Sequence, residues 1–348
     1  MLLARLRSVN RFRNLVGCYG QYYGRTFTSV ARQRSQVTQS TPPPLSHKSS
    51  KMAPVKMEPP PPPPVTTAGD LVESAKRAAG RRAVAEHLDT AYRHIGIGSG
   101  STIKYVVEAI AELPASQTSQ MKFVPTGIQS RELIRAARLP LLDITDLFTE
   151  KEYEDAQQYI DVCFDGADEV DLELNCIKGG GACHLQEKMV ANYSRKFVCV
   201  ADYRKQVPRL LTNWVGVPIE VSPKITEGVR RGLISIGAQK PFIRSGLPGK
   251  AGPVVTDNGN HVIDAPFPTL LLNSEAHLMD PSRGIWTPDA LLNRIKQISG
   301  VIEVGIFTGY DGPEARAAGA NAARAAQKPI VVYFGMADGS VETKYAQK

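Results

Sequence analysis

Short apolar segments alternate with helical patterns along most of this chain of 348 residues. Strand-forming residues are concentrated in residues 122–125, 160–164, 196–201 and 330–334. Between them, residues 129–138 and 185–195 carry apolar side chains at helical spacing. Strands and helices that alternate in this way are typical of a parallel sheet covered on both faces. The sequence therefore predicts an α/β fold with an open, parallel, Rossmann-like sheet and helices on both faces.

A different pattern follows residue 213 and predicts a smaller α+β domain. Residues 254–256 and 261–264 flank Asn258-Gly259, which predicts a β-hairpin with a type I′ turn. Farther along, Thr287 and Pro288 mark the start of a helix. We therefore expect the larger domain to comprise residues 68–212 with 301–348, and the smaller domain to comprise residues 213–300.

Residues 1–67 have the composition of a disordered, basic and proline-rich leader, with six consecutive prolines at 59–64. Seven arginines and no acidic residue within residues 1–35 are typical of a mitochondrial presequence. Met52, however, offers a second start just before the folded part begins. We expect a cytoplasmic protein, with a mitochondrial location as the alternative. Residues 309–328 are rich in alanine and indicate a surface insertion, helical or mobile.

Charge and cysteine content exclude several classes of protein. The net charge is +8, but residues 1–57 hold ten Lys or Arg and no acid, so the remainder has 32 basic against 34 acidic residues. This near-neutral remainder, without a nucleic-acid-binding signature, predicts no nucleic-acid partner. No apolar run is long enough for a membrane span, which predicts no membrane partner. Five cysteines without a C-x-x-C pair argue against a disulfide framework and against structural zinc.

The residues with chemical potential gather after the segment 160–164. Asp165, Asp168, Glu169 and Asp171 follow it, then Lys178, the glycines Gly179, Gly180 and Gly181, and Glu187 in the first turn of the next predicted helix. Singly, each acid suits a turn or a helix cap, and the lysine suits a solvated loop. A divalent cation is a further alternative, but the spacing lacks the pattern of a calcium loop. The clustering indicates an active site beyond the carboxyl end of a strand.

A second glycine loop, residues 96–102, lies between a predicted strand and a predicted helix. It lacks the third glycine of a dinucleotide fingerprint and the pattern of a P-loop. Ser99, Ser101 and Thr102 would present hydroxyls, and Gly100 a backbone N–H, near a helix N-terminus, which suits a phosphate. The alternative is ordinary helix capping by Ser101 or Thr102.

These motifs together resemble the type A ribose-5-phosphate isomerases. The resemblance runs from about residue 71 to residue 307 and resumes at residues 333–341. It is carried by Gly98-Ser99-Gly100-Ser101-Thr102, Asp165-Gly166-Ala167-Asp168-Glu169, Lys178-Gly179-Gly180-Gly181-Ala182, Glu187-Lys188 and Ala201-Asp202 with Lys205-Gln206. Ser99 departs from the family pattern, which usually has Thr there.

The resemblance implies interconversion of D-ribose 5-phosphate and D-ribulose 5-phosphate through an enediolate, without metal or cofactor. Glu187 would carry the proton, Lys178 with the glycine-loop amides would stabilise the anion, and Asp165 and Asp168 would open the sugar ring and move protons between oxygens. The residues expected to bind the sugar phosphate are Ser99, Gly100, Ser101, Thr102, Gly179, Gly180, Gly181 and Lys205. The resemblance also implies a homodimer or homotetramer. The alternatives are a sugar-phosphate sensing module and a coenzyme A transferase of the same fold class.

Overall fold

The computed structural model describes residues 68–149, 160–318 and 327–346. The expectations for the leader, residues 1–67, lie outside the described residues. In the predicted insertion, helix α8 (Gly312–Ala317) is described and residues 319–326 are not.

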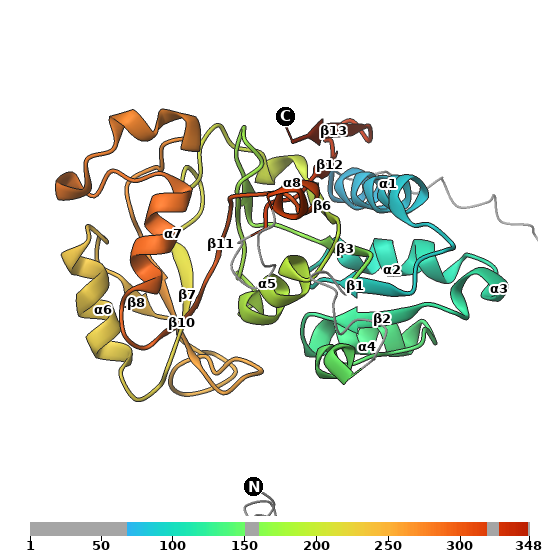
Figure 1. The fold of residues 1–348 in the computed structure, drawn as a ribbon, viewed down its shortest axis with the longest axis horizontal. Coiled ribbons are helices and arrows are strands. Elements are labelled where there is room, and N and C mark those ends of the chain that lie inside the picture. Colours follow the sequence, from blue (N-terminus) through green and yellow to red (C-terminus); the bar gives the residue numbers. More distant parts are fainter. Residues whose placement is uncertain (1–67, 150–159, 319–326, 347–348) are drawn as a thin grey trace, which may run out of the picture. The chain divides into compact units, whose positions relative to one another are not determined.

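The larger sheet has six strands in the order β13-β12-β6-β3-β1-β2 (Figure 1). Five of them run parallel, and β13 pairs antiparallel with β12 at one edge. Their bounds are β1 His94–Ile97, β2 Lys122–Pro125, β3 Val162–Asp165, β6 Phe197–Asp202, β12 Val331–Gly335 and β13 Val341–Tyr345. The predicted open, parallel sheet is confirmed, except for one antiparallel edge strand.

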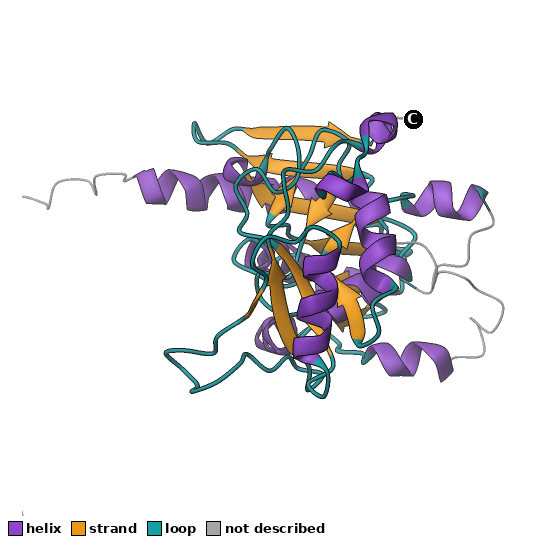
Figure 2. Ribbon diagram, turned by 90° about the vertical axis from the view of Figure 1, so that its left-hand side faces the viewer, coloured by secondary structure: helices purple, strands orange, loops and turns teal. Residues whose placement is uncertain are grey.

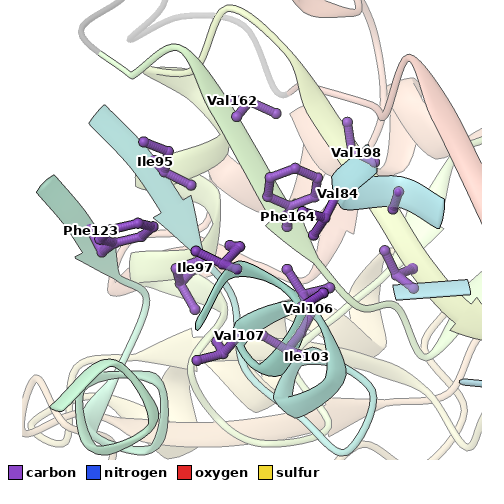
Figure 3. Close-up of a cluster of buried hydrophobic side chains, with 14 of the residues drawn as sticks. Val84, Ile95, Ile97, Ile103, Val106, Val107, Phe123, Val162, Phe164 and Val198 are labelled. Carbon is purple, nitrogen blue, oxygen red and sulfur yellow. The ribbon is translucent and has the colours of Figure 1, made fainter. Parts of the chain in front are cut away.

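Helices cover both faces of this sheet (Figure 2). Side chains alternate between the faces along each strand, so Phe164 and Val198 join one apolar cluster while Cys163 and Cys199 join the other. The first cluster, drawn in Figure 3, includes apolar side chains of helices α1 (Ala68–His87), α2 (Ile103–Ala111) and α4 (Ile128–Ala136). The second includes Val190 of helix α5 (His184–Asn192). Both faces are therefore buried, which explains the nearly continuous apolar runs of the strands.

The strand order places a switch point between β1 and β3. From β1 the chain continues through α2 to β2 on one side, whereas β6 and β12 follow β3 on the other side. The loops after β1 and β3 therefore diverge at one edge of the sheet and leave a crevice between them. Ligands of open α/β sheets bind in such a crevice.

The smaller sheet is antiparallel, with the order β10-β7-β9-β8. Its strands are β7 Val217–Val221, β8 Phe242–Ile243, β9 His261–Ala265 and β10 Val301–Val304. Helices α6 (Thr226–Ser235) and α7 (Pro288–Lys296) share one apolar cluster with the sheet. Thr287 caps α7 as predicted, since its side chain accepts the N–H of Ala290. The predicted α+β character is present. The boundary at residue 300 remains a prediction, and β10 just beyond it hydrogen-bonds to β7.

A three-stranded sheet joins the two parts of the fold. Its order is β11-β5-β4, with β4 Glu169–Val170, β5 Cys176–Ile177 and β11 Ile306–Phe307. The chain passes directly from β10 into β11 through Gly305, whose N–H donates to Pro218 O at 2.7 Å and whose carbonyl accepts the N–H of Lys178 at 2.9 Å. A Cβ at residue 305 would lie 2.1 Å from Lys178 O, so only glycine permits this approach.

The predicted type I′ hairpin is wrong in its turn and in its first arm. Only β9 is a strand, and Val255 forms an isolated bridge with His261. Thr256 O accepts the N–H of Gly259, and within the described residues of this turn only Gly259 has a positive φ, of 80°. A three-residue loop with a left-handed glycine has this pattern. The buried carboxylate of Glu220 explains the difference, because it accepts hydrogen bonds from Thr256, Asn258 and Asn260.

The remaining helices within the described residues are short. They are α3 Ala115–Thr118 and the 3₁₀ helices η1 Ile144–Thr149, η3 Tyr203–Lys205, η4 Asn273–Leu278 and η5 Pro281–Arg283. Among the described helices, none has the length and apolarity needed to cross a membrane.

The close packing of α1 on β12 gives a test of the fold. A Cβ at Gly335 would lie 2.6 Å from the carbonyl carbon of Ala75 and 2.7 Å from its oxygen. Gly335→Ala therefore must push α1 away from the sheet, and we expect a loss of about 1–3 kcal/mol in the free energy of unfolding. Urea denaturation measures this loss.

Gly249→Ala is the matched control, because the nearest atom to a Cβ there is 3.7 Å away. We expect the control to change the free energy of unfolding by less than about 0.5 kcal/mol. Equal midpoints for the two variants would show that the α1 contact is not tight.

Candidate active site

A cavity of about 420 Å³ lies beyond the carboxyl ends of β1, β3 and β6. The residues that line it are Ser99, Gly100, Ser101, Thr102, Gln129, Gly166, Ala167, Asp168, Lys178, Gly179, Gly180, Gly181, Cys183, Glu187, Val200, Ala201, Asp202 and Lys205. Every residue to which the family resemblance gives a catalytic or binding role is among them except Asp165. The structure thus brings together side chains that the sequence separates by about one hundred positions.

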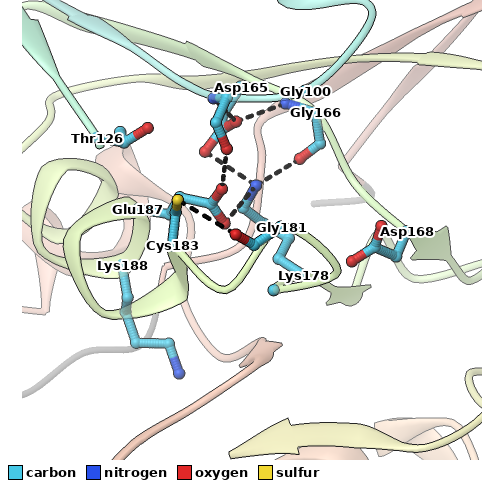
Figure 4. Close-up of polar contacts among 12 residues, drawn as sticks. Gly100, Thr126, Asp165, Gly166, Asp168, Lys178, Gly181, Cys183, Glu187 and Lys188 are labelled. Carbon is cyan, nitrogen blue, oxygen red and sulfur yellow. Dashed lines mark hydrogen bonds and ion pairs between the residues drawn. The ribbon is translucent and has the colours of Figure 1, made fainter. Parts of the chain in front are cut away.

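Lys178 lies at the centre of the polar contacts below this cavity (Figure 4). Its ammonium is 2.8 Å from Asp165 Oδ2 and 3.2 Å from Glu187 Oε2, and it donates to Gly166 O at 2.6 Å. Only 3% of the lysine is exposed. Burial lowers the pKa of Lys178, but the carboxylates of Asp165 and Glu187 outweigh burial and hold that pKa well above its ordinary value. Lys178 is therefore a permanent buried cation.

Asp165 lies beneath the cavity and not in its lining. It is 1% exposed, and its Oδ1 accepts the backbone N–H groups of Ser99 at 3.1 Å and Gly166 at 2.7 Å. Burial raises the pKa of Asp165 to about 7, although the charge of Lys178 opposes the rise. Asp165 therefore connects the loop after β1 to the buried ammonium of Lys178.

Glu187 lies in the first turn of α5, as predicted, and is 4% exposed. Its Oε1 accepts the hydroxyl hydrogen of Ser99 at 2.5 Å, while Oε2 faces Lys178. The neighbouring residue Lys188 anchors the helix from its other side. Its buried ammonium donates to Ile306 O at 2.8 Å and to Glu303 at 3.2 Å, and also to Val304 O. Figure 4 shows Lys188 pointing away from the cluster around Lys178.

Asp168 belongs to the cavity wall on the side of the glycine loop. The N–H of Gly180 donates to Asp168 Oδ2 at 2.7 Å. Burial raises the pKa of Asp168 above its ordinary value, against the opposing effects of the Gly180 N–H and the charge of Lys178. Asp168 is thus the partly accessible carboxyl of the pair, and Asp165 is the enclosed one.

The loop after β1 presents its hydroxyls at the start of α2. Thr102 is the N-cap residue of α2, yet its side chain makes no capping hydrogen bond. Capping by Thr102 therefore does not account for its hydroxyl. The N–H of Gly100 donates to Gln129 Oε1 at 2.8 Å, and the buried ammonium of Lys76 donates to Ser101 Oγ at 3.3 Å. The loop thus combines a helix N-terminus, hydroxyls and a lysine, which suits an anion.

Two of the predicted acids have structural roles. Asp171 accepts the backbone N–H groups of Glu173 and Asn175 and so closes a turn, one of the alternatives considered above. Glu169 is buried, and its carboxylate accepts the backbone N–H groups of Leu211, Asn213 and Trp214. The indole ring of Trp214 in turn faces the ammonium of Lys205, which lies 5.2 Å from the ring centroid. Glu169 therefore supports the wall that carries Lys205.

Sequence reasoning missed Lys76, Gln129 and Cys183. Gln129 follows β2 at the same edge of the sheet as the other site residues, so its position after a strand could have identified it. Lys76 lies within an alanine-rich helical pattern that gives no such signal. Cys183 lines the cavity, but burial raises the pKa of its thiol to about 12, so the thiolate form is scarce.

The arrangement suits proton abstraction next to a carbonyl group. A carboxylate and a buried ammonium line the cavity side by side, and the glycine loop that follows Lys178 lines it as well. These are the parts needed to remove a proton and stabilise the resulting oxyanion. Within the described residues, no group of three or more His, Cys, Asp or Glu is arranged to hold a metal ion.

Comparisons with known proteins point to one family. Residues 122–313 match the family model for ribose 5-phosphate isomerase A (phosphoriboisomerase A). A ribose-5-phosphate isomerase of Mycosarcoma maydis is 48% identical over 79% of this chain and 82% of its own length. One from Eremothecium gossypii is 47% identical over 79% of this chain and 94% of its own length.

A solved D-ribose-5-phosphate isomerase in complex with phospho-erythronic acid has the same fold. Its TM-score is 0.61 at 30% identity, and the match covers 79% of this chain and 99% of that one. This solved structure, the family model and the sequence relatives all indicate the same family. The chain belongs to the ribose-5-phosphate isomerase A family.

Proposed function

We propose that this chain interconverts D-ribose 5-phosphate and D-ribulose 5-phosphate by proton transfer through an enediolate, with Glu187 as the proton carrier. The observation that carries the proposal is the position of Lys178, whose ammonium lies within 3.2 Å of Glu187 at the base of the cavity. A base and a cation so placed can serve one reaction, in which a C–H bond breaks and negative charge appears on oxygen.

Glu187 removes the proton from C2 of the open-chain aldose and returns it to C1. One base suffices because the two carbons are neighbours and present their hydrogens to the same carboxylate. The hydroxyl of Ser99 donates to Glu187 Oε1 and holds the carboxylate in one orientation. Fixed orientation lowers the entropy cost of the transfer.

Lys178 compensates a negative charge both before and after this proton transfer. Before the reaction, its ammonium faces the anionic groups of Asp165 and Glu187. When Glu187 takes the proton, it loses its charge, and the negative charge moves to the oxygens of the enediolate. Lys178 can then donate to that oxyanion, together with backbone N–H groups of the glycine loop, each worth on the order of 3–4 kcal/mol.

The two aspartates take different roles because only one of them lines the cavity. Asp168 is positioned to open the furanose ring and to move protons between O1 and O2. Burial raises its pKa above the ordinary value, which favours a carboxyl that can both give and take a proton. Asp165 holds Lys178 and the Ser99 N–H from below, so it acts through these groups and not on the sugar.

The phosphate lies at the loop after β1 and near Lys205. Ser101, Thr102 and the N–H groups at the start of α2 offer donors, and Lys76 and Lys205 offer positive charge. This placement leaves the carbonyl end of the sugar beside Glu187 and Lys178.

The isomerase is distinguished from its alternatives by a single incubation. With D-ribose 5-phosphate as the only substrate, we expect ketose to accumulate to equilibrium, measured by its absorbance after reaction with carbazole. A sensing module would bind the sugar without turnover, and a coenzyme A transferase would need an acyl-CoA donor. No ketose from the purified chain would refute the proposed function.

Glu187→Gln tests the proton carrier. The amide keeps the shape of the side chain but cannot accept the proton, so we expect kcat to fall by about 10²- to 10⁴-fold. KM should change by less than about 5-fold, because the phosphate contacts remain. Initial rates of ketose formation give both constants.

Glu227→Gln, on the exposed side of α6, is the control and should match the wild-type rate. A Glu187→Gln variant with a folded circular-dichroism spectrum and near-wild-type kcat would exclude Glu187 as the base.

The raised pKa of Asp165 gives a pH dependence. As the pH falls through about 7, Asp165 gains a proton and no longer offers a full charge to Lys178, so kcat/KM should fall on the acid side. Asp165→Asn has no such titration, so its activity should be lower at pH 8 and should vary less between pH 8 and pH 6. Profiles of kcat/KM against pH measure both. An acid limb of the same apparent pKa in the variant would assign the titration to another group.

A further inference from the structure

An arginine of the smaller sheet holds the back of the glycine loop. Arg244 directly follows β8, and its Nη1 donates to Gly179 O at 2.9 Å and to Gly180 O at 3.0 Å. The other edge of the guanidinium faces Asp264 on β9, with Nε donating to Oδ2 at 2.8 Å and Nη2 to Oδ1. The side chains of Arg244 and Asp264 are 17% and 5% exposed, so water competes little for these bonds.

The two carbonyl bonds fix the direction of the N–H groups on the opposite side of the loop. In a trans peptide the C=O of one residue and the N–H of the next point in opposite directions. Because Gly179 O and Gly180 O face Arg244, the N–H groups of Gly180 and Gly181 face away from it. The N–H of Gly180 accordingly reaches Asp168 in the cavity wall at 2.7 Å.

This loop needs an external constraint. Three consecutive glycines have the widest conformational freedom of any sequence, and Gly179 has a φ of 109°, which other residues rarely adopt. Donors that stabilise an oxyanion are effective only when they are already oriented before the charge develops. A planar guanidinium with donors on two edges supplies that orientation, because its position is itself fixed by Asp264.

Arg244 acts without reaching the sugar. Arg244 is not among the described residues that line the cavity. Its charge is balanced by the carboxylate of Asp264, so its main effect is orientation. A charge-assisted hydrogen bond to a peptide carbonyl also polarises that peptide and strengthens its N–H as a donor.

We propose that Arg244, held by Asp264, is a positioning residue that orients and polarises two peptides of the glycine loop, so that the Gly180 N–H holds Asp168 and the Gly181 N–H points toward the enediolate. The inference rests on the proposed isomerase function. It adds the smaller sheet to the catalytic machinery, because Arg244 directly follows β8 and Asp264 lies on β9.

Arg244→Lys and Asp264→Asn test the role from both partners. Lysine keeps the charge but cannot bond two carbonyls and a carboxylate in one plane, so we expect kcat to fall by about 10- to 100-fold with KM within about 3-fold. Asparagine leaves Arg244 in place but loosens it, so we expect a smaller loss in kcat. Arg209→Lys is the matched control, because Arg209 pairs with Glu275 through two nitrogens but does not line the cavity.

A pair of ligands separates orientation from general stability. Phospho-erythronic acid carries a carboxylate that mimics the planar, anionic enediolate, whereas erythritol 4-phosphate has the same chain without that charge. We expect Arg244→Lys to weaken binding of the acid by about the factor lost in kcat, and to leave binding of the alcohol within about 2-fold. Isothermal titration calorimetry measures both affinities, and thermal unfolding reports any loss of stability.

The outcomes are distinct. Equal weakening of both ligands, or a lower melting temperature with unchanged kcat and unchanged affinities, would show that Arg244 has only a structural role and would overturn the inference. A wild-type chain that makes no ketose would refute the proposed function instead. The ligand pair would still report whether Arg244 orients donors toward an anion.

Discussion

A buried ammonium organises this molecule. Lys178 is almost completely removed from water, and an uncompensated charge in such a place would be strongly destabilising. Its compensation comes from Asp165 at the end of β3, Glu187 at the start of α5 and the carbonyl of Gly166. The loop after β1 joins this cluster, because the N–H and the hydroxyl of Ser99 donate hydrogen bonds to the two carboxylates. One cation thus determines how a strand, a helix and two loops must meet.

The same constraint explains why the residues around this ammonium come from more than one sheet. Lys178 follows β5, and its backbone N–H is held by Gly305 between β10 and β11. The ring of Phe307 on β11 lies 5.4 Å from the ammonium of Lys178 and 4.9 Å from that of Lys188. An aromatic face attracts a cation, so Phe307 stabilises both ammonium groups. The three-stranded sheet and Gly305 therefore position the lysine, and the smaller sheet supplies the Arg244 bonds behind the glycine loop.

Local patterns in the sequence predicted the large sheet and most of the cavity wall. Strands buried on both faces give continuous apolar runs, and residues just beyond their carboxyl ends gather in one place, so Ser99 and Asp168 could be assigned without coordinates. Lys205 was assigned only through the resemblance to the family. The sequence could not separate Asp165 from Asp168, because their difference is one of depth and not of spacing. It also missed Arg244, which lies 65 positions from the carbonyl that it bonds. The turn at Asn258-Gly259 was mispredicted for a similar reason, since Glu220 reaches it from a distant strand.

The strand order of the larger sheet has a consequence for biosynthesis on the ribosome. Strand β12 lies between β6 and β13, yet it is made about 130 residues after β6, once the entire smaller sheet has been synthesised. Until then, one hydrogen-bonding edge of β6 has no partner in the sheet, and such an edge can pair with other chains. A nascent polypeptide that already contains Asp165, Lys178 and Glu187 is therefore still incomplete, and it would benefit from protection by a chaperone until residues 331–335 emerge.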